Sequence, residues 1–126
     1  MADHTPKVLL AEDDPFMSAL LAEALAAQGF EVSLAKNGEE AVKNFASLKP
    51  DLLLLDILLP GKNGIEALRE IRGIAGGANV PVIVLSNLEE TTFIREAEAL
   101  GAAAYLVKAN MQIQDIIAKV QEVLKR

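Results

Sequence analysis

The sequence has no cysteine and only one histidine, and these absences exclude several kinds of chemistry. Without cysteine there is no disulfide framework, no thiolate metal site and no cysteine nucleophile. The one histidine, His4, lies in a polar N-terminal stretch, which argues against histidine-based catalysis and against zinc. Any metal site must therefore use oxygen ligands.

The chain also lacks excess positive charge and long apolar runs. Its net charge is -6 and its pI is about 4.8, so a nucleic-acid backbone or an anionic membrane would be repelled. No segment approaches the roughly 18 apolar residues of a membrane span, and the N-terminus has no signal-like apolar core. We expect a soluble cytoplasmic protein that binds neither nucleic acid nor membrane directly.

The length of 126 residues fits one domain with a real core. Short apolar runs alternate five times with helical patterns, which predicts a (βα)5 fold. The predicted strands are Lys7 to Ala11, Glu31 to Ala35, Asp51 to Asp56, Val80 to Ser86 and Ala104 to Lys108. We expect a doubly wound, five-stranded parallel sheet in the flavodoxin-like order 2-1-3-4-5, preceded by a flexible tail at residues 1–6.

Apolar stripes and caps predict the helices between these strands. The first stripe is Met17, Leu20, Leu21 and Ala24. Asp14 before Pro15 is typical of an N-cap, and Gly29 and Gly101 fall where helices should stop. Three pairs resemble capping boxes: Asn37 with Glu40, Asn63 with Glu66, and Asn87 with Glu90.

Asp56 is the most informative residue, because it interrupts the apolar run from Leu52 to Leu59. Burying an unpaired carboxylate is costly, so Asp56 needs an opposite charge, a metal ion or a place at the mouth of a strand. Such an apolar run suggests a strand covered on both faces. Asp56 then marks the point where that strand reaches water.

Other polar residues are predicted to converge on the same edge of the sheet. They follow or end four strands: Glu12, Asp13 and Asp14, then Asp56, then Ser86, then Lys108. Taken singly, the acids could cap a helix, the serine is ordinary and the lysine could extend to solvent. Taken together, clustered carboxylates repel one another unless a cation lies between them, and two or three carboxylates suit Mg²⁺.

These residues suggest phosphoryl chemistry. A metal and a lysine neutralise the oxygens of a transferring phosphoryl group while an aspartate attacks phosphorus. We assign Asp56 as the nucleophile, with Lys108 pairing with a phosphoryl oxygen and Ser86 hydrogen-bonded to it. Asp13 should bind Mg²⁺ directly and Glu12 directly or through water, whereas Asp14 is better explained as the helix cap.

The ordered set of motifs resembles the receiver domain of bacterial two-component response regulators, over nearly the whole chain. The matching segments are Val8 to Asp14, Leu55 to Gly64, Pro81 to Ser86 and Gly101 to Lys108. The resemblance implies a domain that is not a conventional enzyme but catalyses its own phosphorylation and dephosphorylation. It also implies that Asp56 accepts phosphate from a histidine kinase or a histidine phosphotransfer protein. By the same resemblance, Mg²⁺ is bound by Glu12, Asp13, Asp56 and the backbone carbonyl of Leu58. Ser86 and Tyr105 would then form the switch.

Two departures from the family pattern matter. Ala109 stands where most receivers have proline after the lysine, and a cis bond without proline costs about 2.5 to 4 kcal/mol, so we predict a trans Lys108–Ala109 peptide. Ala103 and Ala104 replace an acidic pair used in dimerising relatives. We therefore expect a monomer that binds a downstream protein through its fourth helix, fifth strand and fifth helix, with Ile94 near the exposed side.

Three alternative functions fit the sequence less well. A haloacid-dehalogenase-like phosphatase would need a second aspartate where Leu58 stands. A flavodoxin-like mononucleotide binder would need a phosphate loop after the first strand, where Glu12 to Asp14 would repel it. A phosphorylation-independent interaction module is disfavoured by the complete set of acids, hydroxyl and lysine. The sequence ends just after the fifth predicted helix, as expected for a receiver that stands alone or was excised from a longer protein.

Overall fold

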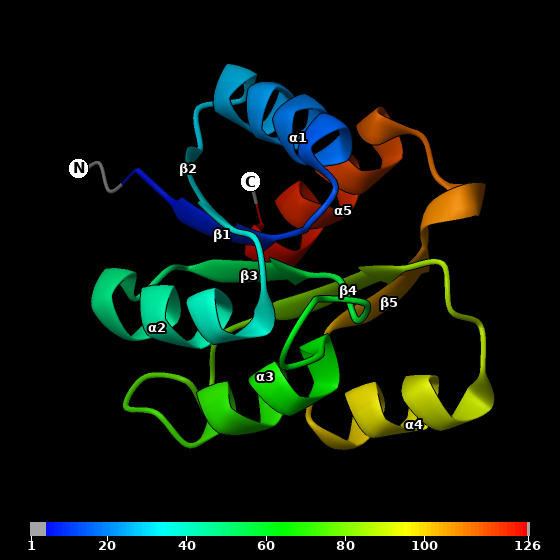
Figure 1. Cartoon of the computed structure of the whole chain (residues 1–126). Helices are drawn as coiled ribbons and strands as arrows, with labels where there is room; N and C mark the ends of the chain where they lie inside the picture. Colours follow the sequence, from blue (N-terminus) through cyan, green and yellow to red (C-terminus); the bar gives the residue numbers. More distant parts are fainter. Residues whose placement is uncertain (1–4, 126) are drawn as a thin grey trace.

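The computed structural model describes residues 5–125, in which five strands alternate with five α-helices (Figure 1). A short 3-10 helix, η1, follows the last strand. The strands are β1 (Lys7–Ala11), β2 (Glu31–Ala35), β3 (Leu52–Leu55), β4 (Val82–Ser86) and β5 (Ala104–Val107). The helices are α1 (Pro15–Ala27), α2 (Gly38–Leu48), α3 (Gly64–Arg72), α4 (Thr91–Ala99), η1 (Lys108–Asn110) and α5 (Ile113–Leu124).

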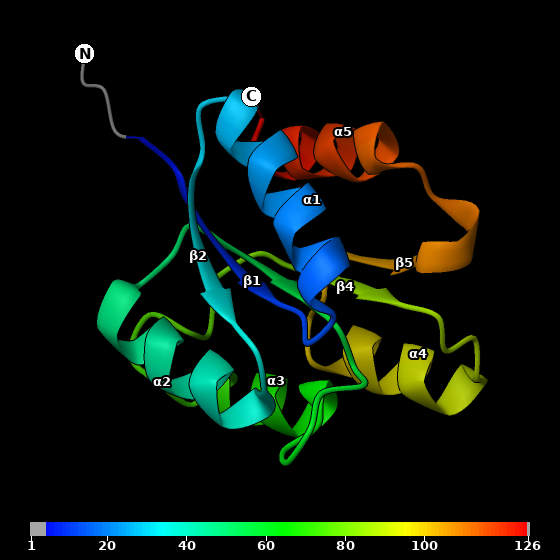
Figure 2. The same cartoon turned by 45° about the horizontal axis from the view of Figure 1, so that its top comes forward.

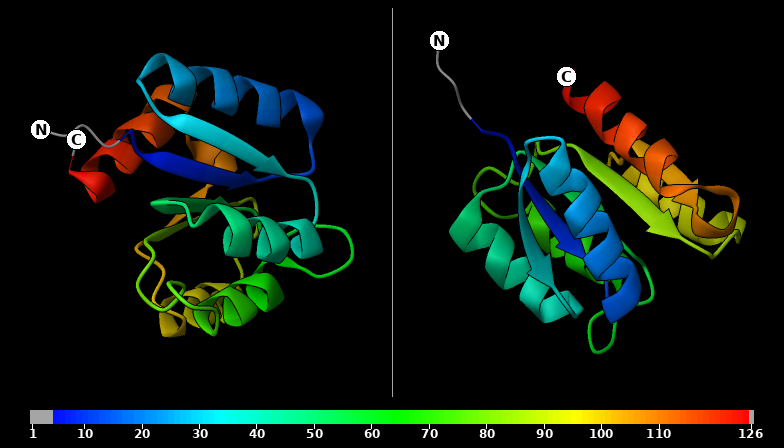
Figure 3. Two further views of the ribbon diagram at one scale, coloured as in Figure 1. Left: turned by 90° about the vertical axis from the view of Figure 1, so that its left-hand side faces the viewer. Right: turned by 90° about the horizontal axis from the view of Figure 1, so that it is seen from above.

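The strands form one parallel sheet in the order β2-β1-β3-β4-β5, which confirms the predicted topology. Helices α1 and α5 cover one face, and α2, α3 and α4 cover the other (Figure 2). The right-hand view of Figure 3, from above, shows α1 (blue) and α5 (orange to red) on the near side of the sheet. Because β1 and β3 are neighbours although β2 lies between them in sequence, the chain changes direction there, and the loops after β1 and β3 meet at one edge.

Alternate residues of the central strands supply two separate cores. In β3, Leu53 and Leu55 pack with α2, α3 and α4, whereas Leu52 and Leu54 pack with α1 and α5. All four leucines are completely buried. The long apolar run before Asp56 is therefore explained by helices on both faces of the strand.

Three predicted strands are shorter than expected, for local reasons. Strand β3 lacks both aspartates at its predicted ends, Asp51 and Asp56. Strand β4 begins after Pro81, because proline has no N–H to continue the ladder, although its carbonyl still accepts from the N–H of Leu53 at 3.0 Å. Strand β5 stops before Lys108, where the backbone turns into η1.

Most helix ends agree with the predicted caps. Asp14 caps α1 by accepting from the N–H of Phe16 at 3.0 Å, and Asn63 with Glu66 forms a complete capping box. Asn37 caps α2, but Glu40 accepts from the N–H of Lys36 rather than from Asn37.

Gly29 and Gly101 end helices with φ of +92° and +79°, a conformation that glycine adopts without a steric penalty.

Two local predictions were wrong. Asn87 and Glu90 form no capping box, because α4 starts later, at Thr91, with Glu90 itself as an N-cap that makes no side-chain bond. Leu20 is exposed rather than buried, because the core face of α1 is formed by Leu21 and Leu25.

The predicted tail at residues 1–6 lies only partly within the described residues. Residues 1–4 are outside them, while Pro6 is buried and its carbonyl accepts from the N–H of Glu31 at 2.9 Å. Across residues 5–125, none of the helices combines the length and the apolar character needed to cross a bilayer.

Arg72 connects backbone segments at the end of the sheet that lies opposite the acidic residues. Its guanidinium donates four hydrogen bonds of 2.7 to 3.1 Å to backbone carbonyls. The acceptors are Leu100 and Gly101 at the end of α4, and Gly77 and Val80 before β4. One side chain from α3 thus joins the end of α4 to the start of β4.

We predict that Arg72→Ala lowers the free energy of unfolding by about 1.5 to 3 kcal/mol, the range for hydrogen bonds to a charged group. Arg69→Ala is the matched control, because Arg69 lies on the same helix and, among residues 5–125, makes only an exposed ion pair with Glu96 at 3.8 Å. Urea unfolding should show a change of less than about 0.5 kcal/mol for this control. Equal effects of the two substitutions would contradict the role given to Arg72.

Candidate functional site

Three carboxylates meet where β1 and β3 end. Glu12 and Asp13 follow β1, Asp56 follows β3, and one carboxylate oxygen from each lies within 4.8 Å of the others. Glu12 and Asp56 are buried, while Asp13 is exposed. The structure thus brings together the acids that the sequence predicted to converge.

The backbone around Asp56 explains its fixed position. Its N–H donates to the carbonyl of Ala11 at 3.0 Å, which continues the pairing of β1 and β3 by one residue. Its Oδ1 accepts from the N–H of Leu58 at 3.1 Å. A Cβ at Gly64 would lie only 2.2 Å from the carbonyl oxygen of Asp56, so glycine is required for α3 to begin against this peptide.

Lys108 connects two of the three acids. Its Nζ lies 2.7 Å from Oδ2 of Asp56 and 2.6 Å from Oε1 of Glu12. Burial acts to lower the pKa of Lys108, but the bonds to Asp56 and Glu12 together outweigh burial and raise the pKa above its ordinary value. The lysine therefore stays cationic and holds the two carboxylates together.

Glu12 has an unusual environment for a carboxylate. Burial raises the pKa of Glu12, although Lys108 and the N–H of Asp14, which donates to Oε2 at 3.1 Å, act in the opposite direction. Within the described residues, Oε1 makes no well-directed hydrogen bond, so its contact with Lys108 is an ion pair that leaves the oxygen able to bind a further cation.

These observations fit a divalent cation. Counted formally, the three carboxylates and the one ammonium carry a charge of minus two, which a divalent ion would neutralise. All the ligand atoms are oxygens, which favours a hard ion, and so few protein carboxylates favour Mg²⁺ with retained waters over a Ca²⁺ cage.

Ser86 and Tyr105 lie on the two strands next to this cluster. Ser86 is completely buried at the end of β4, where its Oγ accepts from the N–H of Leu88 at 3.2 Å. Tyr105 is half-buried on β5, and its hydroxyl donates to the carbonyl of Leu88 at 2.6 Å. Burial raises the pKa of the Tyr105 hydroxyl, which remains a neutral donor. Both side chains thus contact the loop between β4 and α4.

The Lys108–Ala109 peptide is trans, as predicted from the absence of proline. The N–H of Ala109 donates to Oδ1 of Asn87 at 2.8 Å. This contact was not predicted from the sequence, in which Asn87 resembles part of a helix cap. The one feature of the sequence that could have indicated this contact is Ala109, which has a backbone N–H to donate where most receivers have proline.

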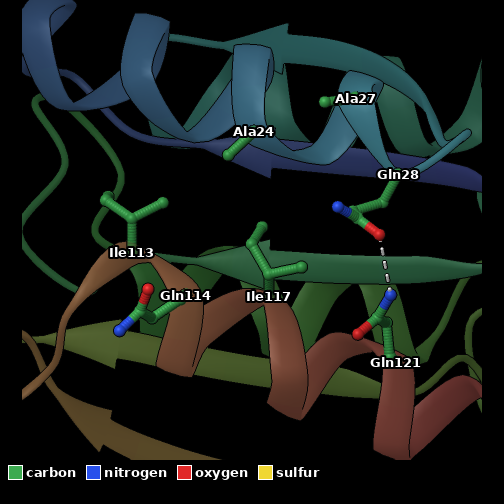
Figure 4. Close-up of a pocket in the computed structure, with 7 residues that line it drawn as sticks. All are labelled: Ala24, Ala27, Gln28, Ile113, Gln114, Ile117 and Gln121. Atoms are coloured by element: carbon green, nitrogen blue, oxygen red, sulfur yellow. Dashed lines mark hydrogen bonds between the residues drawn. The ribbon is translucent and has the colours of Figure 1, made fainter.

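A separate groove of about 510 Å³ lies between α1 and α5 (Figure 4). Gln28 and Gln121 meet across it through a 3.3 Å hydrogen bond. Its lining residues are Ala24, Ala27, Gln28, Ile113, Gln114, Ile117 and Gln121. Since none of them is titratable, the groove offers no acid, base or nucleophile, and the chemistry resides in the acidic cluster.

Comparisons with known proteins agree with this geometry. The family model described as the response regulator receiver domain matches residues 8–121. The chain is 38% identical over 103 residues to the chemotaxis protein CheY of Thermotoga maritima, covering 81% of this chain and 84% of that protein. It is 36% identical over 121 residues to the phosphate regulon transcriptional regulatory protein PhoB of Rhizobium meliloti, covering 96% of this chain and 53% of that protein. It spans about half the length of the first curated relatives that it matches.

One similar solved structure contains a bound metal ion. The receiver domain of the sensor histidine kinase PA1611 from Pseudomonas aeruginosa PAO1 has a TM-score of 0.86 and 27% identity to this chain, with 98% of this chain and 100% of that chain covered. That structure is described as having a magnesium ion coordinated in its active site cleft.

We predict that Mg²⁺ raises the melting temperature, because an ion that binds only the folded chain stabilises it. Asp13→Ala should abolish this rise, since it removes an acid of the cluster. Asp14→Ala is the matched control: it should keep the Mg²⁺ response but lose about 0.5 to 2 kcal/mol of stability as a lost helix cap. Equal loss of the Mg²⁺ response in both variants, measured by thermal unfolding with and without Mg²⁺, would refute the assignment.

Proposed function

Because the chain belongs to the response regulator receiver domain family, we propose that Asp56 accepts a phosphoryl group from a phosphohistidine on a partner protein. The observation that carries this proposal is the contact of one lysine with two buried carboxylates of a three-acid cluster. A purely structural ion pair would need one carboxylate, and grouping three acids here opposes folding unless a cation is bound.

The transfer forms one bond and breaks another. An Oδ of Asp56 bonds to phosphorus while the bond from phosphorus to the imidazole nitrogen breaks. The imidazole leaves with the electron pair, and because its other ring nitrogen carries a proton, it leaves as neutral histidine. The product is an acyl phosphate on Asp56, with no change in total charge.

The other residues of the site bind and orient the phosphoryl group. Lys108, which holds Asp56 before the reaction, pairs with a phosphoryl oxygen as the negative charge moves there. Ser86 donates its hydroxyl hydrogen to another of these oxygens. Glu12, Asp13, Asp56 and the Leu58 carbonyl would hold Mg²⁺, which when bound neutralises negative charge on the phosphoryl oxygens.

The signal then passes to the loop between β4 and α4. A phosphoryl oxygen that attracts Ser86 changes the bond between this hydroxyl and the N–H of Leu88. The carbonyl of Leu88 is the acceptor for Tyr105, so this rearrangement reaches β5. Ile94 is half-buried on α4 and is not part of the packed core, which supports its assignment to a protein-binding face formed by α4, β5 and α5.

The partners follow from this role. We assign a histidine kinase or a histidine phosphotransfer protein as the phosphoryl donor, and a downstream protein as the target. The domain acts in the cytoplasm as a monomer and binds no nucleic acid or membrane itself. Any further activity of a longer protein that contains this domain would be supplied elsewhere.

We predict that acetyl phosphate adds one phosphoryl group to the wild-type protein only when Mg²⁺ is present. Asp56→Asn should remain unmodified, because an amide is a poor nucleophile. Intact-mass spectrometry with and without Mg²⁺ measures this. The control is Asp51→Asn, which changes an aspartate at the opposite end of β3 and should leave modification intact. Equal modification of Asp56→Asn and wild type would disprove the nucleophile assignment.

We also predict a monomer both before and after phosphorylation. Ala103 and Ala104 provide no charges for a charge-paired dimer at β5. Light scattering at micromolar concentration, with and without Mg²⁺ and beryllium fluoride as a phosphoryl mimic, measures the mass. A dimer that appears only with beryllium fluoride and disappears in Ile94→Asp would contradict this prediction.

A further inference from the structure

A side chain extends the contact between β4 and β5 beyond the end of the sheet. The paired residues end at Ser86 and Val107, immediately before the two loops that follow these strands. The next contact between the loops is the 2.8 Å hydrogen bond from the N–H of Ala109 to Oδ1 of Asn87. Each partner is one residue away from a site residue, Ser86 or Lys108.

This bond lies where it can control the reach of Lys108. The lysine backbone has left β5 and begins η1, in which its carbonyl accepts from the N–H of Met111 at 3.1 Å. The flexible side chain must place Nζ within 2.7 Å of both carboxylates, so the position of its backbone decides whether it reaches them. The peptide that joins Lys108 to Ala109 is the one held by Asn87.

We propose that Asn87 is a positioning residue for Lys108, acting through the N–H of Ala109. The inference rests on the proposed phosphoryl transfer to Asp56. Proline at position 109 could not form this bond, because it has no N–H. Asn87 and Ala109 therefore work as a pair, in which the amide oxygen is useful only because residue 109 has a donor.

The neighbouring bonds distinguish this role from general support of the loop. The loop after β4 is also held at Leu88, whose N–H donates to Ser86 and whose carbonyl accepts from Tyr105. These two bonds do not involve Asn87. Removing the Asn87 amide should thus leave the loop attached at Leu88 and release mainly the backbone next to Lys108.

The test is a double-mutant cycle on the rate of Asp56 phosphorylation by acetyl phosphate with Mg²⁺. Asn87→Ala should slow the reaction by about 2- to 12-fold, the factor expected for one neutral hydrogen bond. In a Lys108→Ala background, the same substitution should have no further effect, because there is no ammonium left to position. Equal slowing in both backgrounds, or none in the wild-type background, would overturn the proposal.

Two further variants sharpen the result. Ala109→Pro should slow the reaction as Asn87→Ala does, and combining them should add nothing. The exposed Asn110 provides the matched control, since Asn110→Ala removes an amide from the same loop without touching this bond. Hydrogen exchange of the Ala109 amide should accelerate in Asn87→Ala but not in Asn110→Ala, and unchanged exchange in Asn87→Ala would also overturn the proposal.

The outcomes separate this inference from the function on which it rests. Failure of the wild-type protein to become modified on Asp56 would overturn both. Normal wild-type modification together with additive effects of Asn87→Ala and Lys108→Ala would overturn only the positioning role.

Discussion

The ion pairs of Lys108 are the interaction on which the site depends. They bring a side chain from the end of β5 across to acids that follow β1 and β3, at the edge where parallel strands expose their carboxyl ends. Two buried carboxylates would repel each other strongly without a cation between them. One ammonium reduces that repulsion but does not cancel the charge of the whole cluster, so the cluster keeps a net negative charge that is compatible with a further cation.

The packing of the sheet allows the like-charged carboxylates to be held close together. Its central strands are buried on both faces by α-helices, and the hydrophobic contacts of β3 fix its end in place. Asp56 is held there by two hydrogen bonds: its own N–H donates to the carbonyl of Ala11, and its Oδ1 accepts from the N–H of Leu58. The stability of the two cores thus offsets the cost of grouping like charges at one edge.

The sequence was sufficient to predict the topology and the cluster, because hydrophobic periodicity, apolar runs and strand ends are local signals, and right-handed crossovers leave few possible strand orders. Glu12, Asp13, Asp56 and Lys108 were found in this way, and the structure brings them together. The Asn87 contact could not be predicted, since an asparagine before a helix can bond either to that helix or to another loop. The difference depends on where residue 109, distant in sequence, places its N–H.

The two ends of α4 are held very differently. Arg72 binds the carbonyls of Leu100 and Gly101 at its C-terminal end, whereas its N-cap, Glu90, makes no side-chain bond within the described chain. This nine-residue helix is therefore held firmly at its C-terminal end and less firmly at its N-terminal end. Strain that arises at the β4–α4 loop would be absorbed by fraying of the first turn at Thr91, and amide protection should rise along the helix toward Leu100. The exposed side of the first turn can thereby change while the C-terminal end of the helix stays attached to α3.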